Sequence, residues 1–348
     1  AVTRPAGPTP NPKEHTVGDT TTIEWTDRTW NPISGCTQIS AGCDNCYAKT
    51  IAERFRGGAA FPHGFDIQIR PDKVNAPLTW RKPAKVFVNS MSDLFHADID
   101  RTWIADIFAV MAAVPRHTFQ VLTKRHARMR SLLTDPTFVD QVRSRAIGKG
   151  LTPDAWAWPL PNVWLGVSVE DQKWADIRIP ALLDTPAAIR WISAEPLLGP
   201  IDLTNVGTLN VLRGDSTGHE NGLHWVDGPT INWVVAGGES GHGARPAHPD
   251  WFRTLRNQCA QEHIPFLFKQ HGAWADRTTL TGDQRAAASI WDDKRVTYVH
   301  PVDGRTQSHG DWGSNDHTQG WAAMQNVGKK AAGRELDGRI HDDYPATP

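Results

Sequence analysis

The chain has 348 residues, of which 39% are hydrophobic and 22% charged, and its net charge at pH 7 is −1. These values are typical of a globular protein with one large domain or two ordinary ones, and they exclude a molecule that binds nucleic acid through its overall charge. No apolar run is long enough to cross a membrane, and the N-terminal residues show no signal-peptide pattern. We therefore expect a cytoplasmic protein with no membrane partner.

Residues 1–20 are polar and rich in proline, so we expect a flexible leader there. A weak β-rich run then covers Thr21–Trp25. Six stronger runs of nearly continuous apolar residues follow, as in strands that are covered on both faces of a parallel sheet. The six runs are Lys85–Asn89, Thr118–Leu122, Val163–Val169, Ile189–Ser193, Ile231–Ala236 and Pro265–Phe268.

Helical patterns separate these runs. Tyr47, Ile51 and Phe55 recur at i, i+4 and i+8, and they predict a helix that ends before Gly57. Three further helices carry cap, stop or stripe signals. These signals are Asp100 as a cap with a stop before Pro115, Asp171 as a cap with a stop at Pro180, and an apolar face of Trp251, Leu255 and Cys259.

The alternation of strands and helices predicts an α/β fold, a TIM-like parallel β/α barrel that is partial or complete and carries insertions. A doubly wound open sheet fits less well, because no Gly-x-Gly-x-x-Gly turn follows the first strand. The insertions cover Thr134–Pro161 and Asp202–Pro229. We expect the barrel over residues 21–274 and a C-terminal extension, packed on the barrel, over residues 275–348.

Three of the four cysteines, Cys36, Cys43 and Cys46, lie in one short stretch that begins at a glycine. In a reducing cytoplasm, clustered thiols more often bind metal than form disulfides. Thiolates suit zinc or an iron–sulfur cluster, and three of them leave one metal position open for another ligand. His63 is the nearest extra ligand if the metal is zinc. Cys259 lies on an apolar helix face, where we expect a buried, inert thiol.

Charged groups follow the predicted strands where each ends, and these ends carry the chemistry in α/β barrels. Glu170, Glu195 and Glu239 each follow a strand. A single glutamate there is best explained as a loop charge, but three at equivalent positions favour a catalytic site. Lys124 follows another strand and suits a phosphate or a carboxylate.

Two other patterns each have two interpretations. Gly237 and Gly238 either let a ligand approach the backbone or simply make a turn. The insertion over residues 134–161 mixes basic residues with Trp156 and Trp158, as in proteins that bind single strands. Nucleic acid is therefore a candidate partner.

A three-cysteine loop after a first strand, followed by a barrel, resembles the radical S-adenosylmethionine enzymes. In that superfamily three cysteines hold a 4Fe-4S cluster whose fourth iron binds S-adenosylmethionine, and reduction cleaves this cofactor to a 5′-deoxyadenosyl radical. The spacing here is Cys-x6-Cys-x2-Cys, where the superfamily typically has Cys-x3-Cys-x2-Cys. Asn45 stands where the superfamily has an aromatic residue, and Tyr47 follows the last cysteine instead.

Most of the chain also resembles one bacterial and bacteriophage family of radical-SAM-like proteins with a three-cysteine motif and no assigned reaction. Members are sometimes encoded beside a three-Cys-motif partner protein, so the resemblance implies such a partner. The motifs that carry it are WTDRTWNP (25–32), GC (35–36), CDNCYA (43–48), VNSMSDLF (88–95), LTKR (122–125), WLGVS (164–168), SAEPL (193–197), GGES (237–240) and GKKAAGRELDGR (328–339).

The resemblance implies a 4Fe-4S cluster and S-adenosylmethionine as cofactors, with Cys36, Cys43 and Cys46 as the cluster ligands. It also implies contacts to the second cofactor from several strand ends. These are Asn89, Ser90 and Ser92 with the amino group, Ser168 and Glu170 with the ribose or carboxylate, and Gly237, Gly238 and Glu239 with the adenine or substrate side.

Three functions are open at this point. The first is a radical S-adenosylmethionine-type enzyme that acts on nucleic acid or a nucleotide-derived substrate. The second is an α/β-barrel hydrolase or lyase that uses Glu170, Glu195 and Glu239 as acid/base groups or metal ligands, with structural zinc at the cysteines. The third is a non-enzymatic binding module with a zinc-stapled loop. The first leads, because zinc with three nearby ligands needs a distant fourth.

Overall fold

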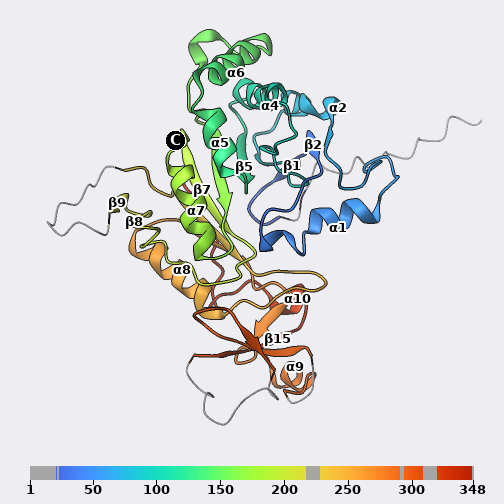
Figure 1. Ribbon diagram of the computed structural model, residues 1–348, viewed down its shortest axis with the longest axis vertical. Helices are drawn as coiled ribbons and strands as arrows, with labels where there is room; N and C mark the ends of the chain where they lie inside the picture. Colours follow the sequence, from blue (N-terminus) through green and yellow to red (C-terminus); the bar gives the residue numbers. More distant parts are fainter. Residues whose placement is uncertain (1–20, 22, 217–227, 291–293, 309–319, 347–348) are drawn as a thin grey trace, which may run out of the picture.

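The computed structural model describes residues 21, 23–216, 228–290, 294–308 and 320–346. At its centre, seven parallel strands form one sheet that curls into a half-barrel (Figure 1). Because β1 and β11 are the two edges of this sheet, the barrel is partial, which confirms the predicted TIM-like α/β fold. In pairing order the strands are β1 (Arg28–Trp30), β4 (Lys85–Val88), β5 (Thr118–Thr123), β6 (Val163–Ser168), β7 (Ile189–Ala194), β10 (Trp233–Gly237) and β11 (Phe266–Gln270).

The six strong apolar runs each overlap one of the strands from β4 to β11. The weaker prediction, a strand over Thr21–Trp25, was wrong, because the first strand begins at Arg28. The Trp25 side chain is 3% exposed and packs among aromatic residues on the inner face of the sheet. Its carbonyl accepts a hydrogen bond from the Gln120 side chain at 3.1 Å. Trp25 thus lies in a turn before the sheet and contributes its side chain to the interior.

Helices cover the outer face of the sheet (Figure 1). Asp100 and Asp171 cap two of them as predicted, accepting hydrogen bonds from the backbone N–H of Thr102 and Trp174. The predicted stop at Pro180 was wrong, because the helix continues to Leu183 with its last residues buried in the core. The helices are α4 (Arg101–Ala113), α5 (His126–Leu133), α6 (Pro136–Gly148), α7 (Gln172–Leu183) and α8 (Pro249–Gln261).

The inner face of the sheet is filled by aromatic side chains rather than by a channel. Trp164, Trp191 and Trp233 are buried there together with Phe87. Gly166 gives Trp191 its space, since a Cβ at this glycine would lie 2.5 Å from the indole ring. These side chains fill the inside of the half-barrel, so a site for chemistry is expected at the ends of the strands rather than in the interior.

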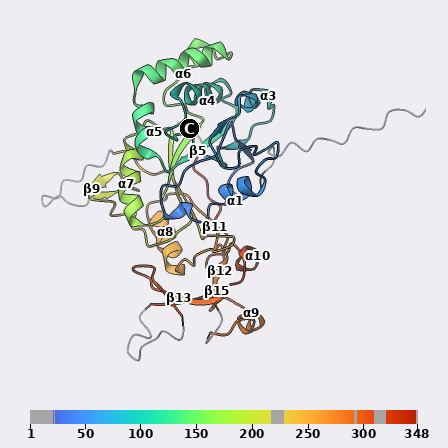
Figure 2. The same cartoon turned by 45° about the vertical axis from the view of Figure 1, so that its right-hand side comes forward.

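The C-terminal residues form a second, antiparallel sheet and then return to the half-barrel (Figure 2). His341 accepts a hydrogen bond from Phe268 N at 2.9 Å through its carbonyl, and the Asp343 carbonyl accepts one from Trp233 Nε1 at 2.9 Å. The elements in this region are β12 (Trp274–Asp276), α9 (Gly282–Ala286), β13 (Val296–Val299), β14 (Thr306–Gln307), β15 (Ala322–Asn326) and α10 (Lys329–Ala332).

Short elements complete the described part of the chain. The insertion over residues 134–161 contains α6, and the one over residues 202–229 contains a small hairpin, while its residues 217–227 lie outside the described ones. No helix among the described residues has the length and apolar character needed to cross a membrane. The short elements are β2 (Ile33–Ser34), η1 (Ala41–Cys43), α1 (Tyr47–Arg54), β3 (Gln68–Ile69), α2 (Pro71–Val74), α3 (Ala76–Thr79), η2 (Pro153–Ala155), β8 (Leu209–Asn210) and β9 (Asp215–Ser216).

Candidate functional site

The cysteine loop lies against the carboxyl ends of the parallel strands. It leaves β2, turns through η1 and enters α1, whose N-cap is Cys46. Gly35 opens the loop with a φ of +86°, and a Cβ there would lie 2.1 Å from the Asp66 carbonyl oxygen, so only glycine fits. Parallel strands end at one edge of a sheet, which brings this loop and the strand-end residues to the same mouth.

The three thiols of the loop are free and half-buried. Burial raises the pKa of Cys36 to about 11, with further increases from the charges of Asp93 and Cys43, so Cys36 and Cys43 lie close enough to interact. The Arg125 guanidinium acts in the opposite direction, with Nη2 at 4.0 Å from the Cys36 sulfur. Among the described residues, no three His, Cys, Asp or Glu side chains converge as an assembled metal site.

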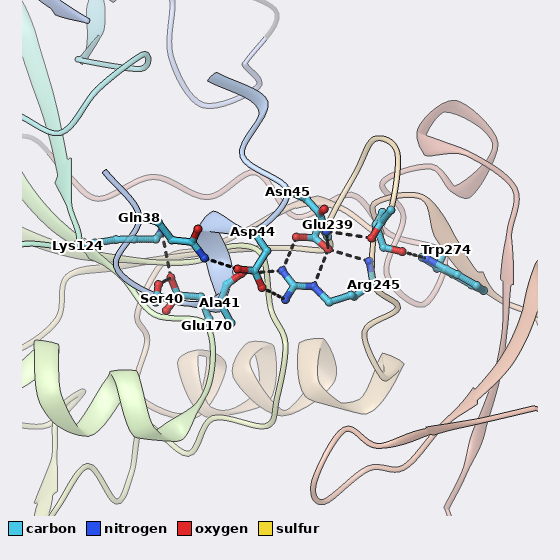
Figure 3. A network of polar contacts seen from close by, with 12 residues as sticks. Gln38, Ser40, Ala41, Asp44, Asn45, Lys124, Glu170, Glu239, Arg245 and Trp274 are labelled. Carbon is cyan, nitrogen blue, oxygen red and sulfur yellow. Dashed lines mark hydrogen bonds and ion pairs between the residues drawn. The ribbon is translucent and has the colours of Figure 1, made fainter. Parts of the chain in front are cut away.

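Glu170, which follows β6, holds the part of the loop between the first two cysteines. Its side chain is fully buried and accepts a hydrogen bond from Ser40 Oγ at 2.9 Å (Figure 3). Lys124 Nζ lies 3.1 Å from one carboxylate oxygen, and Arg178 Nη1 lies 2.9 Å from the other. Gly42 packs directly on this carboxylate, since a Cβ there would lie 2.5 Å from Glu170 Oε1. Lys124, which we expected to bind a phosphate or a carboxylate, thus pairs with the carboxylate of Glu170.

Glu239, which follows β10, holds the part of the loop between the last two cysteines. It is 6% exposed and accepts a hydrogen bond from Asn45 Nδ2 at 3.0 Å (Figure 3). Arg245 Nη2 lies 2.6 Å from its other oxygen. Burial opposes ionisation of Glu239, but the hydrogen bonds from Arg245 and Asn45 outweigh it and lower the pKa. The same Arg245 side chain also reaches Asp44 at 3.0 Å and the Ala41 carbonyl at 2.8 Å.

Glu195, which follows β7, has a different environment from the other two glutamates. Lys269 Nζ lies 2.6 Å from its Oε1, and the two side chains are 18% and 17% exposed. The pKa of Tyr47 is raised first by burial of its hydroxyl group and then by the charges of Cys46 and Glu195. Glu195 therefore also lies near the end of the cysteine loop. Glu170 and Glu239 each accept a hydrogen bond from a side chain of the cysteine loop, whereas Glu195 accepts its hydrogen bond from Lys269.

Of the remaining strand-end residues, some have side chains that form hydrogen bonds and one has a side chain without a partner among the described residues. Ser90 Oγ donates to Asn31 Oδ1 at 3.2 Å, and Ser92 Oγ donates to the Ile33 carbonyl at 2.9 Å. Ser168 is buried, and its carbonyl accepts a hydrogen bond from the guanidinium beside Glu170. Asn89 is 3% exposed and has a φ of +60°, and neither of its amide atoms has a partner among the described residues.

The glycine pair after β10 is packed against protein rather than open to a ligand. A Cβ at Gly238 would lie 2.0 Å from the His271 carbonyl oxygen, and one at Gly237 would lie 3.4 Å from the Glu195 carboxyl carbon. Gly238 therefore allows the ends of neighbouring strands to approach each other closely, whereas the space at Gly237 would hold a small side chain.

The apolar stripe of α1 is exposed rather than packed on the core. The helix itself covers Tyr47–Arg54 as expected, but Tyr47, Ile51 and Phe55 are 53%, 40% and 54% exposed. The buried side is formed by the small residues Ala48 and Ala52. The Tyr47 hydroxyl donates to the Ser90 carbonyl at 2.5 Å, so its ring lies beside the mouth.

The sequence did not reveal several residues that build this site. Arg245 lies in a segment of glycine, proline and histidine with no periodic signal, and Ser40 and Asn45 are ordinary loop residues. Lys269 lies within β11, and no motif or spacing in the sequence marks it. Cys259 is fully buried on α8 as predicted, and burial raises the pKa of its thiol to about 12.

Comparison with known proteins places the chain in a family. A family model described as "Protein of unknown function (DUF5131)" matches residues 20–345. No curated protein matches the sequence. Among solved structures, a spore photoproduct lyase complexed with the dinucleoside spore photoproduct is similar, with a TM-score of 0.38 and 9% identity over 90% of this chain and 73% of that chain. A likeness of that size carries no argument about activity. Since the family model spans nearly the whole sequence, the chain belongs to the DUF5131 family.

Proposed function

We propose that this chain is an iron–sulfur enzyme of the radical S-adenosylmethionine type, with Cys36, Cys43 and Cys46 as the protein ligands of a 4Fe-4S cluster. The observation that carries the proposal is the position of the cysteine loop. One loop bears three free thiols and lies at the carboxyl ends of the strands of a partial parallel barrel, where such folds place their chemistry.

The chemical type of the donors suits such a cluster, and binding would have to draw together three thiols that do not converge among the described residues. Thiolates are the usual protein ligands of iron–sulfur clusters, and three of them leave one iron open for a further ligand. Because the pKa of Cys36 is about 11, its thiol is protonated at neutral pH and must release its proton when it binds metal. The nearby guanidinium of Arg125 would then face the thiolate and stabilise its negative charge.

When bound, the cluster and S-adenosylmethionine would supply one-electron chemistry that the side chains of a protein cannot supply. This chain's own residues would bind and orient. Asn89 is the best candidate for a polar contact to the cofactor, because a buried amide without a partner normally finds one in a ligand or water. Ser90 and Ser92 are already engaged with the loop before the cysteines, so we assign them to support rather than to direct contact.

The substrate side is assigned to Glu195 and Lys269, the half-buried pair at the mouth. A nucleic acid or nucleotide-derived substrate remains our proposal from the sequence. The insertion that suggested it has other contacts, because Arg145 and Lys149 lie near Asp106 and the two tryptophans pack on the core. A three-Cys-motif partner protein and a cytoplasmic location also remain predictions.

The test is anaerobic reconstitution with iron and sulfide, followed by measurement of bound iron, sulfide and zinc. We expect about four irons per chain. Cys43→Ala should lose the cluster, while Cys259→Ala, which removes a buried thiol on α8, should keep it. A chain that binds zinc and takes no iron would contradict the proposal. It would favour a barrel hydrolase or lyase, for which Glu195 with Lys269 is the remaining acid/base pair.

A further inference from the structure

We propose that Glu170 and Glu239 are positioning residues that clamp the cysteine loop from two sides, rather than groups that touch the substrate. Glu170 holds Ser40, between the first and second cysteines, and Glu239 holds Asn45, between the second and third. Each stretch between neighbouring cysteines is thus fixed by one carboxylate from one strand end. The inference rests on the proposed function only in its claim that this loop carries the cluster.

The clamp at Glu239 extends over most of the loop through one arginine. Arg245 donates to Glu239 from Nε and Nη2 and to Asp44 from Nη1, and its Nη2 also reaches the Ala41 carbonyl (Figure 3). Gln38 closes the network by donating to Asp44 at 2.5 Å. A planar guanidinium with several fixed donors suits this use, because it holds two carboxylates and a carbonyl in one geometry.

The engagement of both carboxylates excludes them as general bases in this arrangement. A general base needs a lone pair within hydrogen-bond reach of the substrate proton. In Glu170, Oε1 faces Ser40 and Lys124 while Oε2 faces Arg178. In Glu239, Oε1 and Oε2 are both occupied as well. Both side chains are also almost fully buried, at 0% and 6% exposure.

The experiment measures the order of the loop in the metal-free protein, so it does not depend on the cluster. The reduced full chain is treated with a thiol alkylating reagent under anaerobic conditions, and the rate at each cysteine is measured by mass spectrometry. Asn45→Ala and Ser40→Ala remove the loop side of each contact and leave the buried charges paired. Cys259 serves as an internal monitor, because its alkylation requires the core to open.

We expect Asn45→Ala and Ser40→Ala to raise alkylation of the loop cysteines by about tenfold or more, which is the effect of losing one hydrogen bond to a charged group. The rate at Cys259 should stay the same. Asn75→Ala is the matched control, since it removes the same kind of side chain as Asn45→Ala at an exposed site, where Asn75 accepts a hydrogen bond from Lys149 instead. In that variant the loop rates should not change.

A second readout uses the reconstituted protein, in which the loop variants should hold less iron than the control and show a shifted electron paramagnetic resonance (EPR) signal. Unchanged loop rates and iron content in both loop variants would overturn the clamp, as would an equal rise at Cys259 or in Asn75→Ala. The two proposals fail separately. If the loop opens in the variants but the wild-type chain takes no cluster, the clamp stands and the enzyme assignment fails.

Discussion

Asn45 and Glu239 are 194 residues apart in the sequence, yet Asn45 Nδ2 donates to Glu239 Oε2 at 3.0 Å. The glutamate lies at the end of a central strand, and the asparagine lies between the second and third cysteines. The barrel itself therefore sets the position of this loop.

The first prediction concerns acid. The folded-state pKa of Glu239 is lowered by its hydrogen bonds, so its contribution to stability is present above its ordinary pKa of about 4.3 and is lost as the pH falls through the lower, folded value. We expect the thermal midpoint of the wild type to fall more steeply below about pH 4 than that of Glu239→Gln. Parallel curves for the two proteins would show that this carboxylate does not stabilise the fold through its charge.

The second prediction concerns Gly42. A Cβ at this position would lie 2.5 Å from Glu170 Oε1, and that carboxylate cannot move without breaking its contacts to Lys124 and Arg178. We expect Gly42→Ala to destabilise the protein by about 1–3 kcal/mol in denaturant unfolding. Gly148→Ala is the matched control, because a Cβ there meets nothing within 4 Å. On helix α6 it should be neutral or stabilising by up to about 1 kcal/mol.

The third prediction follows from the exposed stripe of α1. Phe55 is 54% exposed, so Phe55→Ser should change the free energy of unfolding by no more than about 0.5 kcal/mol. Ala52, on the buried side of the same helix, is fully buried, so Ala52→Glu should destabilise by several times that amount. Equal losses in the two variants would mean that the stripe is packed against protein.

Much of the fold could be predicted because it depends on local patterns. Buried parallel strands need apolar residues on both faces, and all six strong runs became strands. Periodicity located α1 but did not show that Ala48 and Ala52 form its buried side, because small residues add little to an apolar pattern. The first strand was misplaced because Thr21–Trp25 has the right residue types, but Trp25 is used as an interior side chain.

The site could be predicted only in outline. The rule that strand ends meet at one mouth placed Glu170 and Glu239 beside the cysteine loop, and the hydrogen bonds agree. Their partners could not be predicted, because Arg245 and Asn45 come together only through the folded chain. For the same reason the sequence could not distinguish two glutamates that hold the loop from Glu195, which is paired with Lys269.

The central claim is an iron–sulfur cluster with one open iron at Cys36, Cys43 and Cys46. The most direct measurement is EPR of the reconstituted and reduced protein, recorded with and without S-adenosylmethionine. The account predicts a 4Fe-4S signal that shifts when S-adenosylmethionine is added and that is absent in Cys43→Ala. A chain that refuses a cluster under these conditions, or a cluster whose signal is the same with and without S-adenosylmethionine, would contradict it.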